Sequence, residues 1–159
     1  MSIISGAAIA VLQHAGWYEG RTIATQKSIH LLENAGYPIF DKVEAFLTEF
    51  GGLDLNYKNS MDVNMFVTFD IEWSLSKAGL YEKDLIVEDY PRAIGCKMLT
   101  LIGRENTSTC LAINEEGIIY TLNDGYILEA GKGKAALDNL ITKSYKELKQ
   151  IPMPDWWGE

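Results

Sequence analysis

The stretch EFGGLDLNY, residues 49–57, decides the fold of this 159-residue chain. It follows a segment, residues 38–50, in which apolar residues recur at the helical spacing i, i+3, i+4 and i+7. Gly51 stands where a left-handed residue often ends a helix, and Gly52 permits a sharp change of direction. Apolar and polar residues then alternate to the end of the stretch, as in a half-buried strand. The sequence therefore predicts a helix-to-strand corner that turns two apolar faces toward one core.

Helices are expected on either side of this corner, and strands mainly after it. The segments after residue 97 are short and rich in β-branched or aromatic residues, and Asp124-Gly125 is a strong hairpin signal. The expected elements are helices 5–14, 25–35 and 38–50, the last with Pro38 in its first turn, strand 64–69, an acidic helix 80–90 ended by Pro91, strands 98–103, 109–113, 118–122 and 126–130, and helix 134–149 with Lys146 and Lys149 in its last turn. This order predicts an α+β fold, an antiparallel sheet with helices packed on one face, in a single domain over residues 1–159.

Composition narrows the class of partner. The chain carries 22 acidic and 14 basic residues, a formal net charge of −8. Such a surface repels phosphates, so direct binding to nucleic acid is not expected, and a basic protein is the better partner. No apolar run approaches the ~18 residues of a membrane helix, and the apolar N-terminal stretch lacks the basic region of a signal peptide. We therefore expect a cytoplasmic protein with no membrane segment.

Catalytic and metal sites find little support in the sequence. His14 and His30 lie far apart, and neither has a spaced carboxylate or cysteine partner. The GKGK stretch at 131–134 lacks the GxxxxGK(S/T) frame and is interpreted as a turn that enters a helix. Cys96 and Cys110 do not form a CxxC pair and are interpreted as free, buried thiols. The sequence thus predicts no enzyme activity, no metal and no cofactor.

Residues 62–92, here called the acidic segment, contain seven acids and three bases, a net charge of −4. Asp70 and Glu72 are expected on one face of a strand, where paired carboxylates can hold a metal or move protons. A solvated face is the simplest interpretation of the segment, and a surface for a basic protein is the next. Trp73 beside the acids fits either a core residue or an interface anchor. The residues predicted to bind a partner are Asp70, Glu72, Trp73, Glu82, Asp84, Glu88 and Asp89.

The C-terminal PMPDWWGE, residues 152–159 and here called the tail, is expected to be irregular. Trp156 and Trp157 present the same choice between packing and docking. For these two side chains, packing against the body of the domain is the favoured interpretation.

Four stretches carry distinctive motifs: AGWYEGR at 15–21, a helix that ends in FGGL at 50–53, AIGCKMLTLIG at 93–103, and CLAINEEGIIYTLNDGYILEAGKGKAALDNLI at 110–141. Together they resemble the third subgroup of the SUKH superfamily of immunity proteins, over about residues 15–142. The matching positions are Gly16, Trp17, Gly20, Arg21, Phe50, Gly51, Gly52, Leu53, Ile94, Gly95, Gly117 and Tyr120. Most of them are glycines or apolar groups, which indicate fold rather than activity. Trp17 and Arg21 are expected to form a packing pair that holds the first turn.

The resemblance implies an α+β fold, no catalytic residues and a cytoplasmic immunity protein of a bacterial polymorphic toxin system. Such a protein binds a cognate toxin domain, often a nuclease, and blocks it. The acidic segment would then face lysines and arginines of the toxin. The alternative is an intracellular regulatory scaffold that binds an endogenous protein, and a small enzyme that uses the carboxylates is the weakest hypothesis.

Overall fold

One antiparallel sheet of seven strands organises the computed structural model, which describes residues 4–123 and 126–158. Each strand pairs with the next one in the sequence, so the sheet is a continuous meander. The strands are β1 (Asp54–Lys58), β2 (Asn64–Thr68), β3 (Leu99–Glu105), β4 (Thr109–Asn114), β5 (Ile118–Asn123), β6 (Tyr126–Lys132) and β7 (Lys149–Ile151). The turn expected at Asp124-Gly125 lies outside the described residues, while β5 and β6 on either side of it pair antiparallel.

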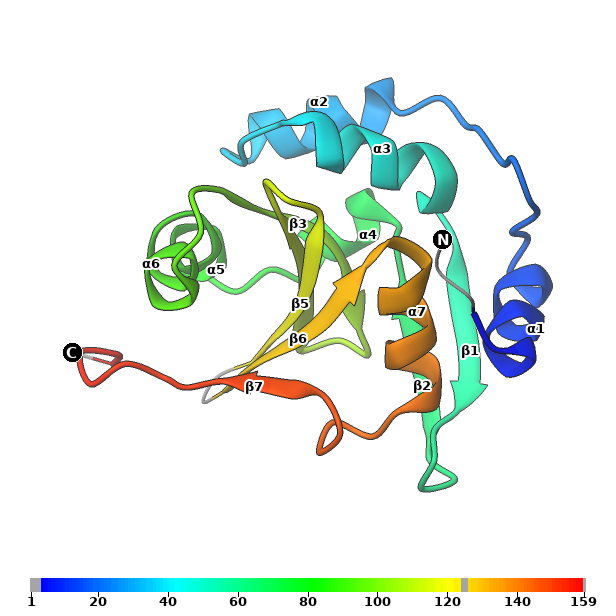
Figure 1. Ribbon diagram of the computed structural model, residues 1–159. Coiled ribbons are helices and arrows are strands. Elements are labelled where there is room, and N and C mark those ends of the chain that lie inside the picture. Colours follow the sequence, from blue (N-terminus) through cyan, green and yellow to red (C-terminus); the bar gives the residue numbers. More distant parts are fainter. Residues whose placement is uncertain (1–3, 124–125, 159) are drawn as a thin grey trace.

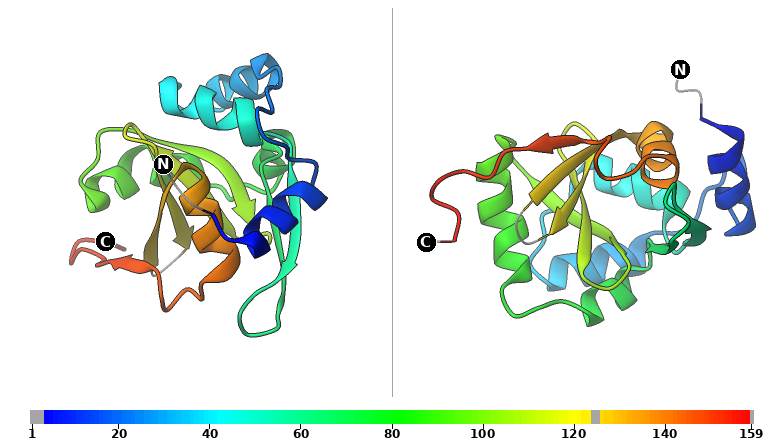
Figure 2. Two further views of the ribbon diagram at one scale, coloured as in Figure 1. Left: turned by 45° about the vertical axis from the view of Figure 1, so that its right-hand side comes forward. Right: turned by 90° about the horizontal axis from the view of Figure 1, so that it is seen from below.

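Helices lie on both sides of this sheet (Figures 1 and 2). They are α1 (Gly6–His14), α2 (Gln26–Asn34), α3 (Asp41–Phe50), α4 (Ile71–Ser76), α5 (Glu82–Asp84), the π-helical turn η1 (Leu85–Asp89), α6 (Tyr90–Ile94) and α7 (Gly133–Thr142). α7 packs on β5 and β6, and α5, η1 and α6 lie on the other side of these strands (Figure 1). The predicted α+β fold is confirmed, with a second helical layer in addition to the single one expected.

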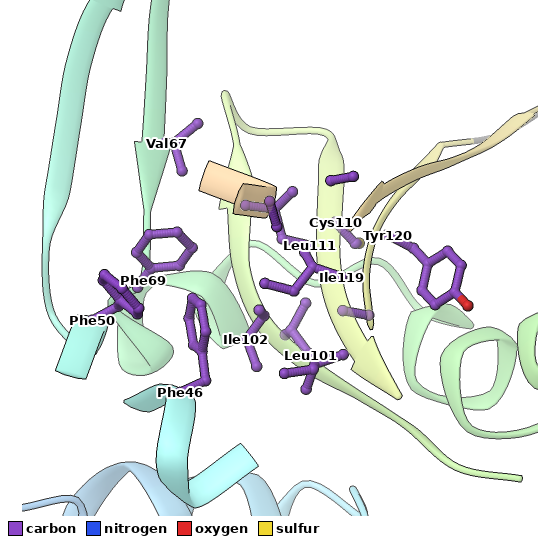
Figure 3. Packing of buried hydrophobic residues seen from close by; sticks show 14 of the residues in the cluster. Phe46, Phe50, Val67, Phe69, Leu101, Ile102, Cys110, Leu111, Ile119 and Tyr120 are labelled. Atoms are coloured by element: carbon purple, nitrogen blue, oxygen red, sulfur yellow. The ribbon is translucent and has the colours of Figure 1, made fainter. Parts of the chain in front are cut away.

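The two layers explain why β3 and β4 are buried along nearly their whole length. Phe46 of α3 lies 5.0 Å from Phe69, centroid to centroid, and Leu111 and Ile119 lie beside this cluster (Figure 3). Tyr120, the next residue of β5, points away from Phe46 to the other side of the sheet (Figure 3). Successive side chains of a strand alternate between faces, so both sets of side chains are buried in a strand that is covered on both faces.

The predicted helix-to-strand corner is present, but its two glycines differ in role from the prediction. Gly51 has φ −56° and ψ 139°, and it is Gly52, with φ 79°, that adopts the left-handed conformation. A Cβ at Gly51 would lie 2.5 Å from the carbonyl oxygen of Leu47. Close approach to the last helical turn therefore requires glycine at Gly51, and a positive φ requires it at Gly52.

Trp17 and Arg21 fasten this corner. The indole Nε1 of Trp17 donates to Glu49 Oε2 at 2.9 Å. The Arg21 guanidinium donates to the backbone carbonyls of Glu49 and Gly51, the second at 2.9 Å. The last carbonyls of a helix have no partner within the helix, so Arg21 satisfies groups that would otherwise need water. The two side chains thus join the AGWYEGR turn to the end of α3.

Two prolines occupy places other than those predicted. α3 begins at Asp41, so Pro38 precedes the helix, and its carbonyl accepts a hydrogen bond from the Thr100 hydroxyl. Pro91 does not end the acidic helix, because the chain stays helical through it: Pro91 follows the π-helical turn η1 and is the second residue of α6, which continues to Ile94. Gly95, with φ 89°, ends α6 instead.

The last helix is also shorter than predicted. α7 ends at Thr142, and residues 149–151 form β7, which pairs with β6 at the edge of the sheet. Lys146 and Lys149 therefore do not lie in a helical turn. β7 directs the following chain, the tail, along the sheet toward α6 (Figures 1 and 2).

Candidate partner-binding surface

The acidic segment folds into two arms on one side of β3. The first arm is α4, the second is the continuous helix α5–η1–α6, and the loop 77–81 joins them. Arg104 of β3 holds both arms, because its Nε donates to the carbonyl of Ser74 at 2.7 Å and its guanidinium pairs with Glu82. The side chain of Arg104 is only 1% exposed, so the acidic surface is anchored from beneath.

Asp70, Glu72 and Trp73 belong to the start of a helix, and the prediction that the two acids share a strand face is wrong. Asp70 caps α4 by accepting a hydrogen bond from the backbone N–H of Trp73 at 2.9 Å, the role that aspartate favours at helix starts. Glu72 pairs with Lys27 of α2 at 2.8 Å. The half-buried Trp73 ring packs edge-on against Phe66, with 5.6 Å between centroids. The first arm is therefore fixed to both α2 and β2.

Glu82 is directed inward. Its carboxylate pairs with Arg104 and accepts a hydrogen bond from the Cys110 thiol at 3.1 Å, and its side chain is 14% exposed. Burial favours a lower pKa for Arg104, but the hydrogen bonds and charge interactions with Glu82 and Cys110 together outweigh it, and the pKa is raised. Burial raises the pKa of Cys110 to about 12, so this thiol stays protonated at neutral pH. The geometry gives Glu82 the task of holding the second arm in place.

Asp84, Glu88 and Asp89 are the outward-facing acids of the second arm. Asp84 pairs with the neighbouring Lys83 at 2.7 Å, on the exposed surface. Glu88 and Asp89 form no ion pair with any residue that the structure describes. Exposed pairs contribute little stability, so all three carboxylates can pair with a basic partner at small cost.

The tail lies against the second arm. Trp157 packs on Tyr90 of α6 with 4.7 Å between ring centroids, and the Arg92 guanidinium lies 4.2 Å from the centre of the Trp156 ring. The favoured interpretation, packing against the body of the domain, is confirmed. The contact with the acidic segment was not predictable, because it depends on the pairing of β7 with β6.

Sequence analysis also missed two prominent side chains. Leu80 and Tyr81, in the loop before α5, are 87% and 68% exposed. The sequence places both residues in the acidic helix expected over residues 80–90. The irregular spacing of apolar residues in that segment could have indicated their exposure, because an apolar residue outside a buried stripe can face solvent.

The described residues were compared with the requirements of a metal site and of a membrane segment. Within residues 4–123 and 126–158, no group of three or more His, Cys, Asp or Glu side chains could hold a metal ion. Within the same residues, no helix is both long and apolar enough to cross a membrane. His30 contacts Asn34 on the exposed side of α2, and His14 lies at the end of α1. Neither histidine lies in the acidic segment.

The SUKH-3 immunity protein model matches residues 4–143. This chain belongs to the SUKH-3 immunity protein family. Comparisons with curated proteins and with solved structures gave no significant match. The SUKH-3 match contains the corner and the whole acidic segment, and it ends before β7 and the tail. The resemblance found from the motifs is confirmed, and family membership supports a role as an immunity protein.

The motif residues of this SUKH-3 protein have structural roles. Trp17, Phe50 and Leu53 are buried in the core around the corner. Gly95 and Gly117 adopt positive φ values, 89° at the end of α6 and 87° in the turn between β4 and β5. The motifs therefore specify turns and core, and leave the identity of the partner to other residues.

Proposed function

We propose that this SUKH-3 protein is a cytoplasmic immunity protein that binds a cognate toxin domain and covers the active site of that toxin. The family match over residues 4–143 carries the proposal. The toxin we propose is a nuclease, because a surface that holds phosphates is basic and fits a protein of net charge −8. Inhibition is by occlusion, without catalysis by the immunity protein.

The toxin would contact the outward face of both arms. Asp84, Glu88 and Asp89 supply charge on the second arm, and Asp70, Glu72 and Trp73 form the first. Glu82 contributes by keeping the second arm in position through Arg104. Long-range attraction between such an acidic surface and a basic site accelerates association more than it slows dissociation.

Charge reversal tests this assignment. The triple variant Asp84→Lys, Glu88→Lys and Asp89→Lys is compared with Glu44→Lys, Glu116→Lys and Glu147→Lys, which changes net charge equally at exposed acids outside the acidic segment. Association with the toxin domain encoded by the neighbouring gene is measured by stopped-flow at several salt concentrations. The first triple should slow association about tenfold or more and flatten its salt dependence, and the control should have a much smaller effect.

Both triples should leave the free energy of unfolding within about 0.5 kcal/mol per site of the parent, because the changes are on the surface. Equal effects of the two triples on association would show that only net charge matters and that the surface is wrongly assigned. Absence of protection when the protein and the toxin domain are co-expressed would overturn the immunity function itself and favour the regulatory scaffold.

A further inference from the structure

A groove of about 1110 Å³ lies between the second arm and the tail. Residues 79–81 and helix α6 line one side, residues 156–158 line the other, and Cys110 and Leu122 of β4 and β5 contribute to its lining between them. Small-molecule sites usually measure roughly 300–1,000 Å³. The groove is close to the upper end of this range, so it has room for the side chains of a segment of protein chain.

Aromatic side chains dominate the groove. The rings of Tyr90 and Trp157 pack at a tilt of 41° with 4.7 Å between centroids, and Trp157 lies 5.8 Å from Trp156, so the three rings are in contact in series along one side. Leu80 and Tyr81 lie on the opposite side of the groove, and both side chains are largely exposed. Adjacent exposed apolar side chains of this size, beside an aromatic wall, are typical of contact sites, where tryptophan and tyrosine dominate binding energy.

The groove is already formed without a partner. The Arg104–Glu82 pair fixes the start of the second arm, directly after Leu80 and Tyr81. On the opposite side, pairing of β7 with β6 and the stacking of Arg92 on Trp156 hold the tail. A preformed site loses less conformational entropy on binding than one that must order itself.

The acidic side chains around the groove favour a basic partner. Glu88, Asp89 and the exposed Asp155 form no ion pair with the described residues, and the single cation that lines the groove, Arg92, already lies over Trp156. A second copy of this chain, also of net charge −8, would be repelled. A basic segment would gain both the carboxylates and the faces of the aromatic rings.

We propose that the groove between the second arm and the tail binds a segment of the toxin domain in which an arginine or lysine stands beside a large apolar residue. The apolar side chain packs between Tyr81 and Trp157, and the cation pairs with Asp89. This inference rests on the proposed function and narrows it to one site. One wall of the site, the tail, lies outside the residues that the family model matches, so this chain adds it to the shared domain.

The four tryptophans offer a direct test, because each indole N–H gives its own NMR signal. The ¹⁵N-labelled protein is titrated with the toxin domain, and separately with a short amidated peptide that alternates leucine and arginine. Both ligands should shift the Trp156 and Trp157 signals, while Trp17, bonded to Glu49 at the corner, should not move. The same peptide with glutamate in place of arginine should shift none of them.

Variants quantify the contribution of each wall. Trp157→Ala should weaken toxin binding about tenfold or more, and Leu80→Ser, at a residue that is 87% exposed, should weaken it several-fold. Met61→Ser, at a 64% exposed apolar residue outside both the acidic segment and the groove lining, is the matched control and should have little effect. The dissociation constants are measured by titration calorimetry.

The outcomes separate the two proposals. If the toxin binds but the Trp156 and Trp157 signals stay still and both groove variants bind like the parent, the groove is not the site, and the immunity function stands. If the toxin does not bind while the arginine peptide shifts the tail indoles, the function is wrong and the groove still takes a basic apolar segment. If neither ligand shifts these signals, the groove proposal is overturned.

Discussion

The corner and the acidic segment are both held by an arginine, yet they use charge in opposite ways. At the corner, Arg21 donates hydrogen bonds to two backbone carbonyls, and the indole N–H of Trp17 donates one to the carboxylate of Glu49. In the acidic segment, Arg104 forms an ion pair with the inward Glu82, while Glu88 and Asp89 form no ion pair with a described residue. The side chains of Trp17, Arg21 and Glu49 at the corner are bonded within the protein, whereas Glu88 and Asp89 of the acidic segment form no ion pair with a described residue.

This difference separates residues that specify the fold from residues that can bind. A group already hydrogen-bonded inside the protein must break that bond to meet a partner, so it contributes little to association. The corner contains much of the family motif, and the free carboxylates lie where no motif was recognised. A chain can therefore keep the recognisable motifs of its family and still carry a partner-binding surface that differs from those of other members.

The largest effect is expected at Arg104, and it tests whether the acidic surface depends on its buried anchor. Arg104→Ala leaves the inward carboxylate of Glu82 without its cation, bonded only to the Cys110 thiol, and should cost about 3–5 kcal/mol of unfolding free energy, measured by urea denaturation. The double variant Arg104→Met with Glu82→Met removes both charges and should be clearly more stable than the single one. A single variant as stable as the parent would show that the pair is not an anchor.

A smaller loss of stability is expected at the corner, where two variants separate the close packing of Gly51 on the Leu47 carbonyl from the positive φ of Gly52. Gly51→Ala places a Cβ against the Leu47 carbonyl and should cost roughly 2–3 kcal/mol. Gly52→Ala meets open space and should cost about 1 kcal/mol, through its positive φ alone. Both are measured by thermal and urea unfolding. The reverse order would mean that the left-handed residue, and not the tight turn, fixes the corner. Toxin binding by either folded variant should match that of the parent.

The smallest effect concerns an acid that belongs to neither region. Glu105, at the end of β3, forms no ion pair with a described residue, and burial raises its pKa. The folded state then binds the proton more tightly than the unfolded state, so the contribution of Glu105 to stability is most favourable below the ordinary pKa of glutamate and is lost as the pH rises through the folded pKa. Glu105→Gln should therefore stabilise the protein at pH 7 and have little effect near pH 4. Urea unfolding at the two pH values measures this, and Glu116→Gln on the exposed surface is the control. Equal effects at both pH values would contradict the burial argument.

Sequence patterns predicted the helix stripe of α3, the alternation of β1 and the four strands β3 to β6 because these depend on neighbours within a few residues. They were wrong where a distant contact decides the local structure. Residues 149–151 form a strand because β6 offers an open edge, and Asp70 starts a helix immediately after β2 leaves the sheet. Of the predicted partner-binding residues, Glu82 could not be distinguished from Glu88 in sequence, because its inward direction depends on Arg104, 22 residues away.

The sequence by itself determined the fold class, the corner and the family, since apolar periodicity and glycine positions are local consequences of backbone geometry. Only the tertiary structure decided which acids face outward, and that the tail closes a groove with the second arm. The physical reason is that a side chain's exposure and charge pairing depend on segments that meet in space, and the pairing of β7 with β6 brings Trp157 to Tyr90 across more than sixty residues of chain.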